Sequence, residues 1–225
     1  MIVVTGASKG LGRAICERLL SKKIEVFGLA RDVSEVPFPA MNCDVSSYED
    51  VKAVARKLKR DGTKIDGLIN AAGVASMNLA VTTPPNVSQK IVQTNLLGTI
   101  YCCQLISPLI IRNKMGSIIN FSTIAVALGL KGESIYAASK AGVEGFTRAF
   151  AREMADFNVN VNCIAPGPID TNLLKGITAA QINKIVSQQI IPKQYTPEAI
   201  SDLVELLLDS RSKSLSGQVL HVGGV

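Results

Sequence analysis

The chain has 225 residues, which suits one or two domains, and 47% of them are apolar, which is enough to bury a substantial core. Its net charge of +6 is compatible with an anionic small ligand, but the densest basic run, at residues 52–60, falls at the end of an expected helix, where cations suit the helix dipole and water. Charge therefore gives little support to a nucleic-acid-binding protein.

No Pro/Gly/Ser-rich linker, internal repeat or low-complexity tract interrupts the chain, so we expect one domain over residues 1–225. Residues 1–6 resemble a strand entering a glycine turn, and the apolar stretch 98–111 is too short and too interrupted to cross a membrane. The five cysteines have no C-x-x-C spacing and are typical of buried, reduced thiols. We therefore expect a cytoplasmic protein with no membrane association, no nucleic-acid partner and no metal site.

A strand, a glycine loop, a helix and a second strand open the chain. Residues 2–4 are apolar, helical periodicity runs to residue 21, and the second strand follows at 24–30. Glycines between a strand and a helix let the backbone approach a pyrophosphate, and the helix N-terminus offers free N–H groups to it. The spacing is G-x-x-x-G-x-G rather than the commoner G-x-G-x-x-G. The candidate cofactor-binding residues of this loop are Gly6, Ser8, Lys9, Gly10, Leu11 and Gly12.

The end of the second strand predicts which dinucleotide binds. Arg31 follows the strand tip and can bind the 2′-phosphate of NADP(H) in bidentate fashion, and Lys9 is placed to reach the same phosphate. We therefore favour NADP(H) as the cofactor. One alternative is NAD(H), with the Asp32 carboxylate binding the ribose 2′-hydroxyl. The other is that Arg31 and Asp32 are solvated turn residues.

Tyr136 and Lys140 are the most informative pair in the chain. They lie four residues apart on an expected helix, so they share one face. An ammonium beside a phenol favours the phenolate and would lower the tyrosine pKa from about 10 toward neutrality. The spacing alone is common in helices, but beside a dinucleotide loop it predicts a general acid/base.

The order of these motifs resembles that of the short-chain dehydrogenase/reductase family, in its compact single-domain subgroup, over nearly the whole chain. The glycine loop is similar to the T-G-x-x-x-G-x-G loop of that family. The other similar segments are Cys43-Asp44-Val45, Asn70-Ala71-Ala72-Gly73, Asn95 on a long helix, Ser122 fourteen positions before Tyr136, and Pro166-Gly167-Pro168-Ile169-Asp170-Thr171. Ala71 departs from the second Asn of the family motif, and no acidic or amide residue precedes Gly223-Gly224.

The resemblance implies a role for each catalytic candidate. Tyr136 would exchange a proton with the substrate oxygen, and Ser122 would hydrogen-bond that oxygen. Lys140 would tune Tyr136 and hold the nicotinamide ribose, and Asn95 would anchor a water in the proton path. The remaining residues that the resemblance assigns to the cofactor are Asp44, Val45, Asn70, Ala71, Gly73, Pro166, Gly167, Ile169 and Thr171.

The expected fold is a doubly wound, Rossmann-type α/β domain with a mostly parallel sheet and helices on both faces. By resemblance, long helices near 86–112 and 135–156 would form the interface of a homodimer or homotetramer. Residues 172–195 would form a substrate lid, because a segment rich in isoleucine and leucine at helical spacing can close over a pocket.

The expected activity is NADP(H)-dependent interconversion of a carbonyl and a secondary alcohol. An apolar lid, with Ala125, Val126 and Leu128 beside it, suits small ketones and 3-oxoacyl thioesters. The pattern is similar to that of 3-oxoacyl-acyl-carrier-protein reductases, so acyl carrier protein is a candidate partner, for which the candidate contacts are Lys131, Lys175 and Lys193.

Other functions share parts of this pattern. An NAD-dependent alcohol, polyol or sugar dehydrogenase would carry the same motifs. A non-catalytic NADP(H)-binding sensor would have no need of the Ser122, Tyr136 and Lys140 set. Epimerases and dehydratases with a related Tyr/Lys pair usually carry a longer C-terminal substrate domain, for which this chain is too short.

Overall fold

Seven parallel strands form one central sheet in the order β3-β2-β1-β4-β5-β6-β7. The computed structural model describes residues 1–171 and 178–225. The strands are β1 Ile2–Thr5, β2 Val26–Ala30, β3 Ala40–Asn42, β4 Gly67–Asn70, β5 Gly116–Phe121, β6 Val159–Pro166 and β7 Val219–Val222. All the pairings are parallel, which confirms the predicted doubly wound α/β fold.

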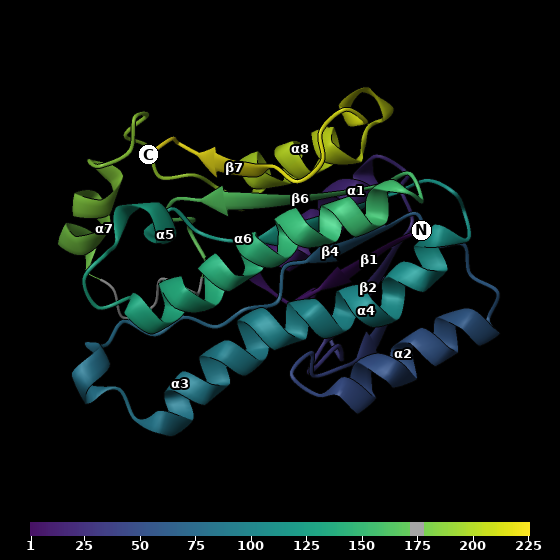
Figure 1. Cartoon of the computed structure of the whole chain (residues 1–225), viewed down its shortest axis with the longest axis horizontal. Helices are drawn as coiled ribbons and strands as arrows, with labels where there is room; N and C mark the ends of the chain where they lie inside the picture. The colour runs from purple at the N-terminus through teal and green to yellow at the C-terminus, as the bar shows by residue number, and fades with distance from the viewer. Residues whose placement is uncertain (172–177) are drawn as a thin grey trace.

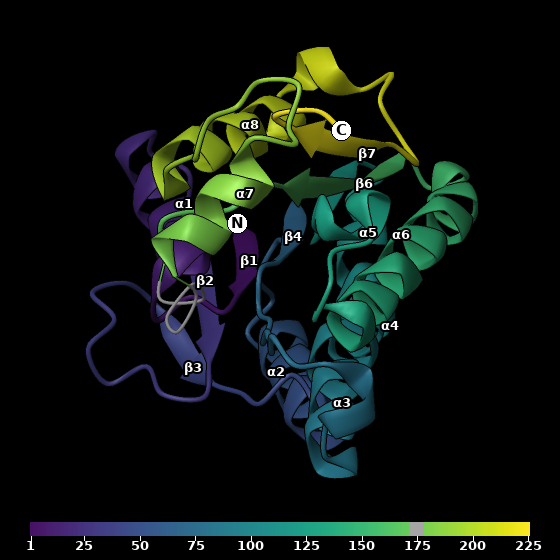
Figure 2. The same ribbon diagram turned by 90° about the vertical axis from the view of Figure 1, so that its left-hand side faces the viewer.

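Helices cover both faces of the sheet, as Figure 2 shows in a view from its end. The helices are α1 Gly10–Ser21, α2 Tyr48–Arg60, α3 Pro85–Val92, α4 Gly98–Ile111, α5 Ala125–Leu128, α6 Ser134–Ala155, α7 Ala179–Val186 and α8 Pro197–Leu208. One apolar core packs the sheet against α2, α4 and α6, and the other packs it against α1 and α8. Strands covered on both faces are buried throughout, which explains the continuous apolar runs of β1, β2 and β4.

The side of the sheet on which successive strands are added changes between β1 and β4. From β1 the sheet grows through β2 to β3 on one side and through β4 to β7 on the other. Crevices that bind ligands in open α/β sheets form beyond the carboxyl ends of the strands at such a switch point. In Figure 1 the arrowheads of β6 and β7 mark that end of the sheet, with α5 and α7 beside it.

The connection between β2 and β3 is short. Residues 31–39 join these parallel strands directly, without a helix, and Phe38 of this segment is buried in the core beside α1 and α8. β2 itself starts at Val26, two residues later than the sequence suggested. The adenosine end of the predicted cofactor crevice is therefore bordered by a loop.

The predicted long helix near residue 86 is one continuous helical run, Pro85–Ile111, with a π-helical segment at Gln93–Leu97 between α3 and α4. Its length and apolar composition alone would let it cross a membrane. Half of its most apolar window is buried inside the protein, where Ile106 and Ile110 belong to the core under α2 and α6. It is packed as a core helix of this fold.

Candidate active site

A cavity of about 630 Å³ lies at the carboxyl end of the strands and reaches from the glycine loop to the N-terminus of α6. Most of the predicted cofactor residues line it: Gly6, Ser8, Lys9, Gly10, Leu11, Gly12, Arg31, Asp44, Val45, Ala71, Gly73, Tyr136, Lys140, Pro166, Gly167, Ile169 and Thr171. The chain therefore brings the dinucleotide loop and the Tyr/Lys pair to one crevice, although Gly12 and Tyr136 lie 124 positions apart in sequence.

The glycine loop leaves no room for side chains at two of its positions. Gly6 has a φ of +71°, and a Cβ there would lie 3.0 Å from the backbone of Ala72. A Cβ on Gly12 would collide with the carbonyl of Gly6. The loop thus packs against its own helix and against the segment after β4, and the first three residues of α1, Gly10, Leu11 and Gly12, line the cavity. Such a cradle fits a pyrophosphate.

Arg31 and Asp32 both line the adenosine end of the cavity but differ in their partners. The Asp32 carboxylate accepts a 3.0 Å hydrogen bond from the backbone N–H of Ser34, and hydrogen bonds from Ser34 lower the pKa of Asp32. Among the described residues, Arg31 has no ion pair. The guanidinium is therefore the more available group for a ligand.

Asp44 lies in a turn beside the same end of the cavity. Its Oδ1 accepts hydrogen bonds from the backbone N–H and the hydroxyl of Ser46, at 3.0 and 2.6 Å. Its own N–H donates to Asp50 at 3.0 Å. Val45, next in the chain, packs against Gly98 at the start of α4. These contacts fix the orientation of the Asp44–Val45 segment at the cavity wall.

Asn70 does not line the cavity, in contrast to the expectation from sequence. Its amide is buried between strands and donates to Asn120 of β5 at 2.8 Å and to the Cys103 thiol at 3.3 Å. Asn120 in turn donates to Thr147 of α6 at 2.9 Å. Asn70 is the last residue of β4, and its side chain lies on the face of the sheet that α4 and α6 cover. It holds β4, β5 and α6 together.

Tyr136 and Lys140 share one face of α6, as predicted, but their electrostatics differ from the prediction. Burial raises the pKa of Tyr136 above its usual value, Glu133 raises it further, and hydrogen bonding with Thr123 offsets part of the rise. Burial lowers the pKa of Lys140 to about 8, and its Nζ donates to the Phe121 carbonyl at 2.8 Å. The expected lowering of the Tyr136 pKa is therefore not found, because desolvation and the Glu133 charge both raise it.

The hydroxyl beside Tyr136 belongs to Thr123, a residue that the sequence analysis missed. Ser122 lines the cavity wall, but its buried hydroxyl donates a 2.7 Å hydrogen bond to the carboxylate of Glu144 on α6. Alternation along an extended chain explains the difference, since Asn120 and Ser122 both face α6 and Thr123 faces the other way. The sequence signal that could have found Thr123 is the second hydroxyl directly after Ser122.

Asn95 lies in the π-helical segment and is fully buried behind the cavity. Its side-chain amide exchanges two hydrogen bonds with the backbone of Val74, at 2.8 and 2.9 Å, and donates to Ser139 at 3.1 Å. Its main-chain carbonyl accepts the Thr99 hydroxyl at 2.8 Å. Asn95 thus joins the segment after β4 to α6, one turn from Tyr136. π-helical bulges are frequent at functional sites.

The Pro166–Thr171 loop closes the cavity on the β6 side, and Gln189 supports it from behind. Gln189 is buried, and a Cβ on either Gly167 or Gly223 would collide with its amide. Its Nε2 donates to the Lys193 carbonyl at 2.9 Å, while its Oε1 has no partner within the described residues. The loop, the end of the predicted lid and the C-terminus are therefore packed around one amide.

Only part of the predicted lid can be placed against the cavity. Residues 172–177, including Lys175, lie outside the described residues. Ile182 and Ile185 of α7 line the cavity, whereas Ile190 and Ile191 are exposed, at 74% and 57%. Two of the apolar residues of the expected lid therefore line the cavity and two do not, and the lid itself stays a prediction.

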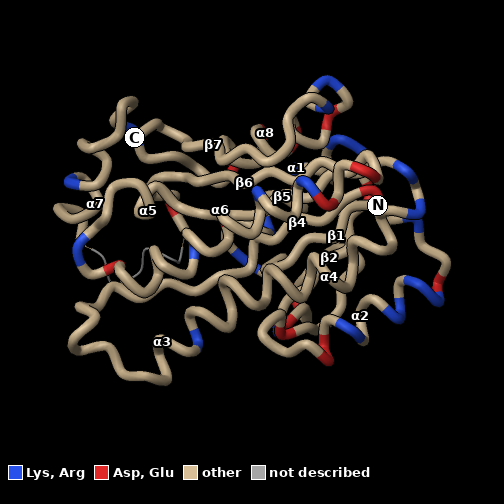
Figure 3. Tube along the Cα trace, viewed as in Figure 1, with Lys and Arg blue, Asp and Glu red and all other residues tan. Residues whose placement is uncertain are grey.

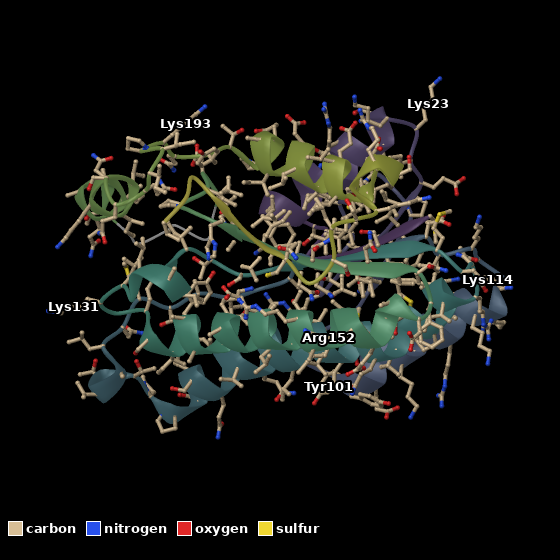
Figure 4. The ribbon with its side chains drawn as sticks, turned by 45° about the horizontal axis from the view of Figure 1, so that its top comes forward. Lys23, Tyr101, Lys114, Lys131, Arg152 and Lys193 are labelled. Atoms are coloured by element: carbon tan, nitrogen blue, oxygen red, sulfur yellow. The ribbon has the colours of Figure 1, made fainter. Side chains whose placement is uncertain are left out.

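The basic residues that the structure describes are scattered over the molecule and do not form one dense patch (Figure 3). Figure 3 shows lysine and arginine spread over both ends of the molecule. Figure 4 shows Lys131 and Lys193 projecting at the end of the sheet where the strands finish, opposite Lys23 and Lys114. Lys193 also lies 5.9 Å from the centre of the Tyr195 ring. Lys131 and Lys193 therefore lie at the same end of the molecule as the carboxyl ends of the strands (Figure 4), and their contact with a carrier protein stays a prediction.

The cysteines and the single histidine are not acid/base candidates of the cavity, although Cys43 lines it and Cys163 lies near enough to Lys140 for their charges to interact. All five cysteines are buried and free of disulfides, as predicted, and burial raises the pKa of each thiol, to about 12 for Cys16, Cys43, Cys103 and Cys163. His221 pairs with Ala165 on the last strand and does not line the cavity. The described acid/base groups of the site are those around Tyr136.

Comparisons with known proteins identify relatives along the whole chain. A family model described as Enoyl-(Acyl carrier protein) reductase matches residues 6–224. The chain is 32% identical to carbonyl reductase family member 4 of Xenopus laevis, over 98% of this chain and 95% of that protein. It is 31% identical to the 3-oxoacyl-[acyl-carrier-protein] reductase FabG of Vibrio cholerae, over 99% and 95%.

Two solved structures share the fold closely. One is the ligand-free aldohexose dehydrogenase of Thermoplasma acidophilum, with a TM-score of 0.89 and 29% identity, covering 99% of this chain and 92% of that one. The other is ElxO with NADP bound, with a TM-score of 0.89 and 26% identity, covering 98% and 96%. The relatives thus include proteins named for acyl thioester, carbonyl and sugar substrates.

Proposed function

Because the chain belongs to the short-chain dehydrogenase/reductase family, whose members are NAD(P)-dependent oxidoreductases, we propose that it interconverts a carbonyl and a secondary alcohol with NADP(H). The observation that carries the proposal is the meeting of Tyr136, Thr123 and Lys140 in the cavity that also holds the glycine loop. The bound cofactor supplies the hydride, and the residues of this chain supply position and protons.

Tyr136 is the proposed proton donor to the oxygen of a carbonyl substrate. A phenol whose pKa is raised keeps its proton at neutral pH and so begins the reduction in the required form. Thr123, beside the phenol, is proposed to donate a hydrogen bond to the same oxygen as negative charge develops on it. Thr123 thus takes the role that the sequence analysis gave to Ser122, whose hydroxyl is already donated to Glu144.

Lys140 and Asn95 are proposed to act behind Tyr136. Lys140 lines the cavity with its Nζ bonded to the Phe121 carbonyl, which leaves two N–H groups for ribose hydroxyls. A bound nicotinamide ribose would bring acceptors to these groups and favour the charged lysine. Asn95 holds Val74 and Ser139 in place, and Ser139 donates to the carbonyl of Tyr136 at 2.7 Å. Its proposed contribution is to the position of Tyr136 and of a water next to Lys140.

NADP(H) is the proposed cofactor, with NAD(H) as the alternative. The Arg31 guanidinium faces the cavity without an ion pair among the described residues, and Lys9 lines the same end. The Asp32 carboxylate is already bonded to Ser34, which makes it a weaker candidate for a ribose hydroxyl. A relative of the same fold has been solved with NADP bound. These observations favour a 2′-phosphate over a free 2′-hydroxyl.

A 3-oxoacyl thioester carried on acyl carrier protein is one proposed substrate, supported by the FabG relatives. Ala125, Leu130 and Ile182 give the substrate end of the cavity an apolar lining that suits an acyl chain. Lys131 and Lys193 at the same end would face an acidic carrier protein. We further propose that the protein is cytoplasmic and is a homodimer or homotetramer through the long helices, the run α3–α4 and α6.

The test is carbonyl-dependent oxidation of NADPH by the wild type and by Tyr136→Phe. A panel of a 3-oxoacyl thioester, simple ketones and an aldose is offered with NADPH and with NADH. The proposal expects turnover of at least one carbonyl by the wild type and a loss of about 10² to 10⁴ in kcat for the variant, with NADPH still raising its Tm. A Tyr136→Phe protein with full turnover would refute the proposed acid/base.

A further inference from the structure

Glu133 places a carboxyl group in the substrate end of the cavity, beside the proposed proton donor. It lines the cavity, is half-buried, and precedes Tyr136 by three residues at the start of α6. It is also near enough for its charge to raise the pKa of the Tyr136 phenol. None of the roles assigned above uses this carboxyl group.

A structural role for the Glu133 side chain is not found in its contacts. Glu133 is the N-cap residue of α6, but its side chain makes no capping hydrogen bond. Its backbone N–H donates to Leu130, and its carbonyl accepts from Ala137 at 2.7 Å, so only its main chain serves the helix. Within the described residues its carboxylate has no hydrogen bond and no ion pair.

The surroundings of the Glu133 carboxyl make it a strong acceptor. Burial raises its pKa, and its neighbours in the cavity wall include the apolar Leu130. Unpaired polar groups away from water are costly, so a ligand that supplies a donor gains more here than at an exposed carboxylate. The charged or titratable groups around it are the phenol of Tyr136, the buried Lys140 that lines the same cavity, and the exposed Lys131 two residues earlier in the chain.

We propose that Glu133 is a substrate-specificity residue that accepts a hydrogen bond from a hydroxyl group adjacent to the reacting carbonyl. The preferred substrates would then be hydroxylated carbonyl compounds rather than plain alkyl ketones. This inference rests on the proposed function, because it takes Tyr136 and Thr123 to bind the carbonyl oxygen. Glu133 lies one helical turn before Tyr136, so its carboxyl group would contact a substituent next to the carbonyl oxygen rather than that oxygen itself.

The test compares two ketones that differ by one hydroxyl, acetoin and butan-2-one, with NADPH. We expect the wild type to have the higher kcat/KM for acetoin, and Glu133→Leu to lower the acetoin/butan-2-one ratio at least tenfold. A tenfold change is what the loss of one hydrogen bond to a charged group would give. Glu153→Leu is the matched control, since Glu153 is exposed on the same helix and does not line the cavity. An unchanged ratio in Glu133→Leu overturns the inference.

A binding measurement separates failure of this inference from failure of the proposed function. The two corresponding alcohols, butane-2,3-diol and butan-2-ol, are titrated against the protein with NADPH by thermal shift. The inference is supported if the diol raises the Tm of the wild type more than butan-2-ol does and Glu133→Leu removes this difference. This outcome supports it even if no ketone is turned over. Equal shifts overturn it while leaving reductase activity intact. A larger preference for 3-aminobutan-2-one than for acetoin would overturn the hydroxyl assignment in favour of an ammonium group.

Discussion

The buried hydroxyl of Ser122 donates a 2.7 Å hydrogen bond to the buried carboxylate of Glu144, eight residues beyond Tyr136 on the same helix. The other partner of Glu144 is Arg148, at 3.4 Å and largely exposed. The Ser122 hydroxyl is therefore the hydrogen-bond donor to this carboxylate on the side that faces the sheet. Its first effect is on the packing of α6 against β5.

Ser122→Ala is expected to destabilise the protein more than it impairs catalysis. Removal of the hydroxyl leaves a buried carboxylate oxygen without its donor, which costs about 1–3 kcal/mol in the free energy of unfolding. Urea denaturation of Ser122→Ala against Ser134→Ala, an exposed serine on α6, measures the cost. Equal stability of the two variants would contradict the role given to the Ser122–Glu144 bond.

Thr123→Val is expected to show the opposite balance. The substitution keeps the shape of the side chain and removes the hydroxyl beside Tyr136, so kcat/KM should fall by about 10² to 10³. The free energy of unfolding should fall by about 1 kcal/mol at most, because the hydroxyl also accepts a 3.2 Å hydrogen bond from the Ala125 N–H at the partly buried start of α5. Thr123→Ser keeps the hydroxyl and serves as the matched control, with activity close to that of the wild type. If Ser122→Ala loses the activity and Thr123→Val keeps it, the hydroxyl of the site is Ser122 after all.

Arg31→Ala is expected to remove the preference for NADPH. The loss of a charge-assisted contact with a 2′-phosphate should raise the Kd of NADPH by about tenfold or more and leave that of NADH nearly unchanged. Thermal shift titration is the suitable measurement, because the chain has no tryptophan. If instead NADH binds better and Asp32→Ala weakens it, the carboxylate takes the ribose and the cofactor is NAD(H).

The charge state of Lys140 predicts a pH dependence of stability. Its pKa falls to about 8 in the folded protein, from 10.5 for an ordinary lysine. Between these pH values the unfolded chain holds a proton that the folded chain has released, so this group makes the free energy of unfolding rise with pH, by up to about 1.4 kcal/mol per unit. Lys140→Met lacks this contribution.

The measurement is the difference between wild-type and Lys140→Met unfolding free energies at pH 7 to 9.5. The buried cysteines act in the opposite direction above about pH 9, because the unfolded chain then loses thiol protons that the folded chain keeps. Cys16, Cys43 and Cys103 are the same in both proteins and cancel in the difference, whereas Cys163 interacts with the Lys140 charge and belongs to the Lys140 contribution. Parallel pH curves for the two proteins would show that Lys140 is charged throughout.

The sequence determined the fold and most of the cavity because both rest on patterns of fixed period. The apolar runs of β1, β2 and β4 identify strands buried on both faces, and the glycines of the loop are required by backbone contacts that any residue with a Cβ would break. The pairing of Tyr136 with Lys140 follows from helical geometry alone.

The incorrect site predictions concern residues at strand ends, whose side chains could point either into the cavity or into the protein interior. Ser122 and Thr123 are adjacent hydroxyl residues at a strand end, and a shift of one position exchanges the cavity for the interior. Asn70 shares this ambiguity at the end of β4. The raised pKa of Tyr136 depends on burial and on Glu133, and neither is visible in the spacing of two residues.

The π-helical segment at Gln93–Leu97 sets the phase of the longest helical run in the fold. One extra residue in a helix of 3.6 residues per turn offsets the two halves by about 100°. Lys90 before the segment and Thr94 within it line the cavity, whereas Ile106 and Ile110 beyond it belong to the core. Deleting a single residue from this segment would restore an unbroken α-helix and rotate one half relative to the other. One helix could then no longer contribute residues to both the cavity and the core in their present positions.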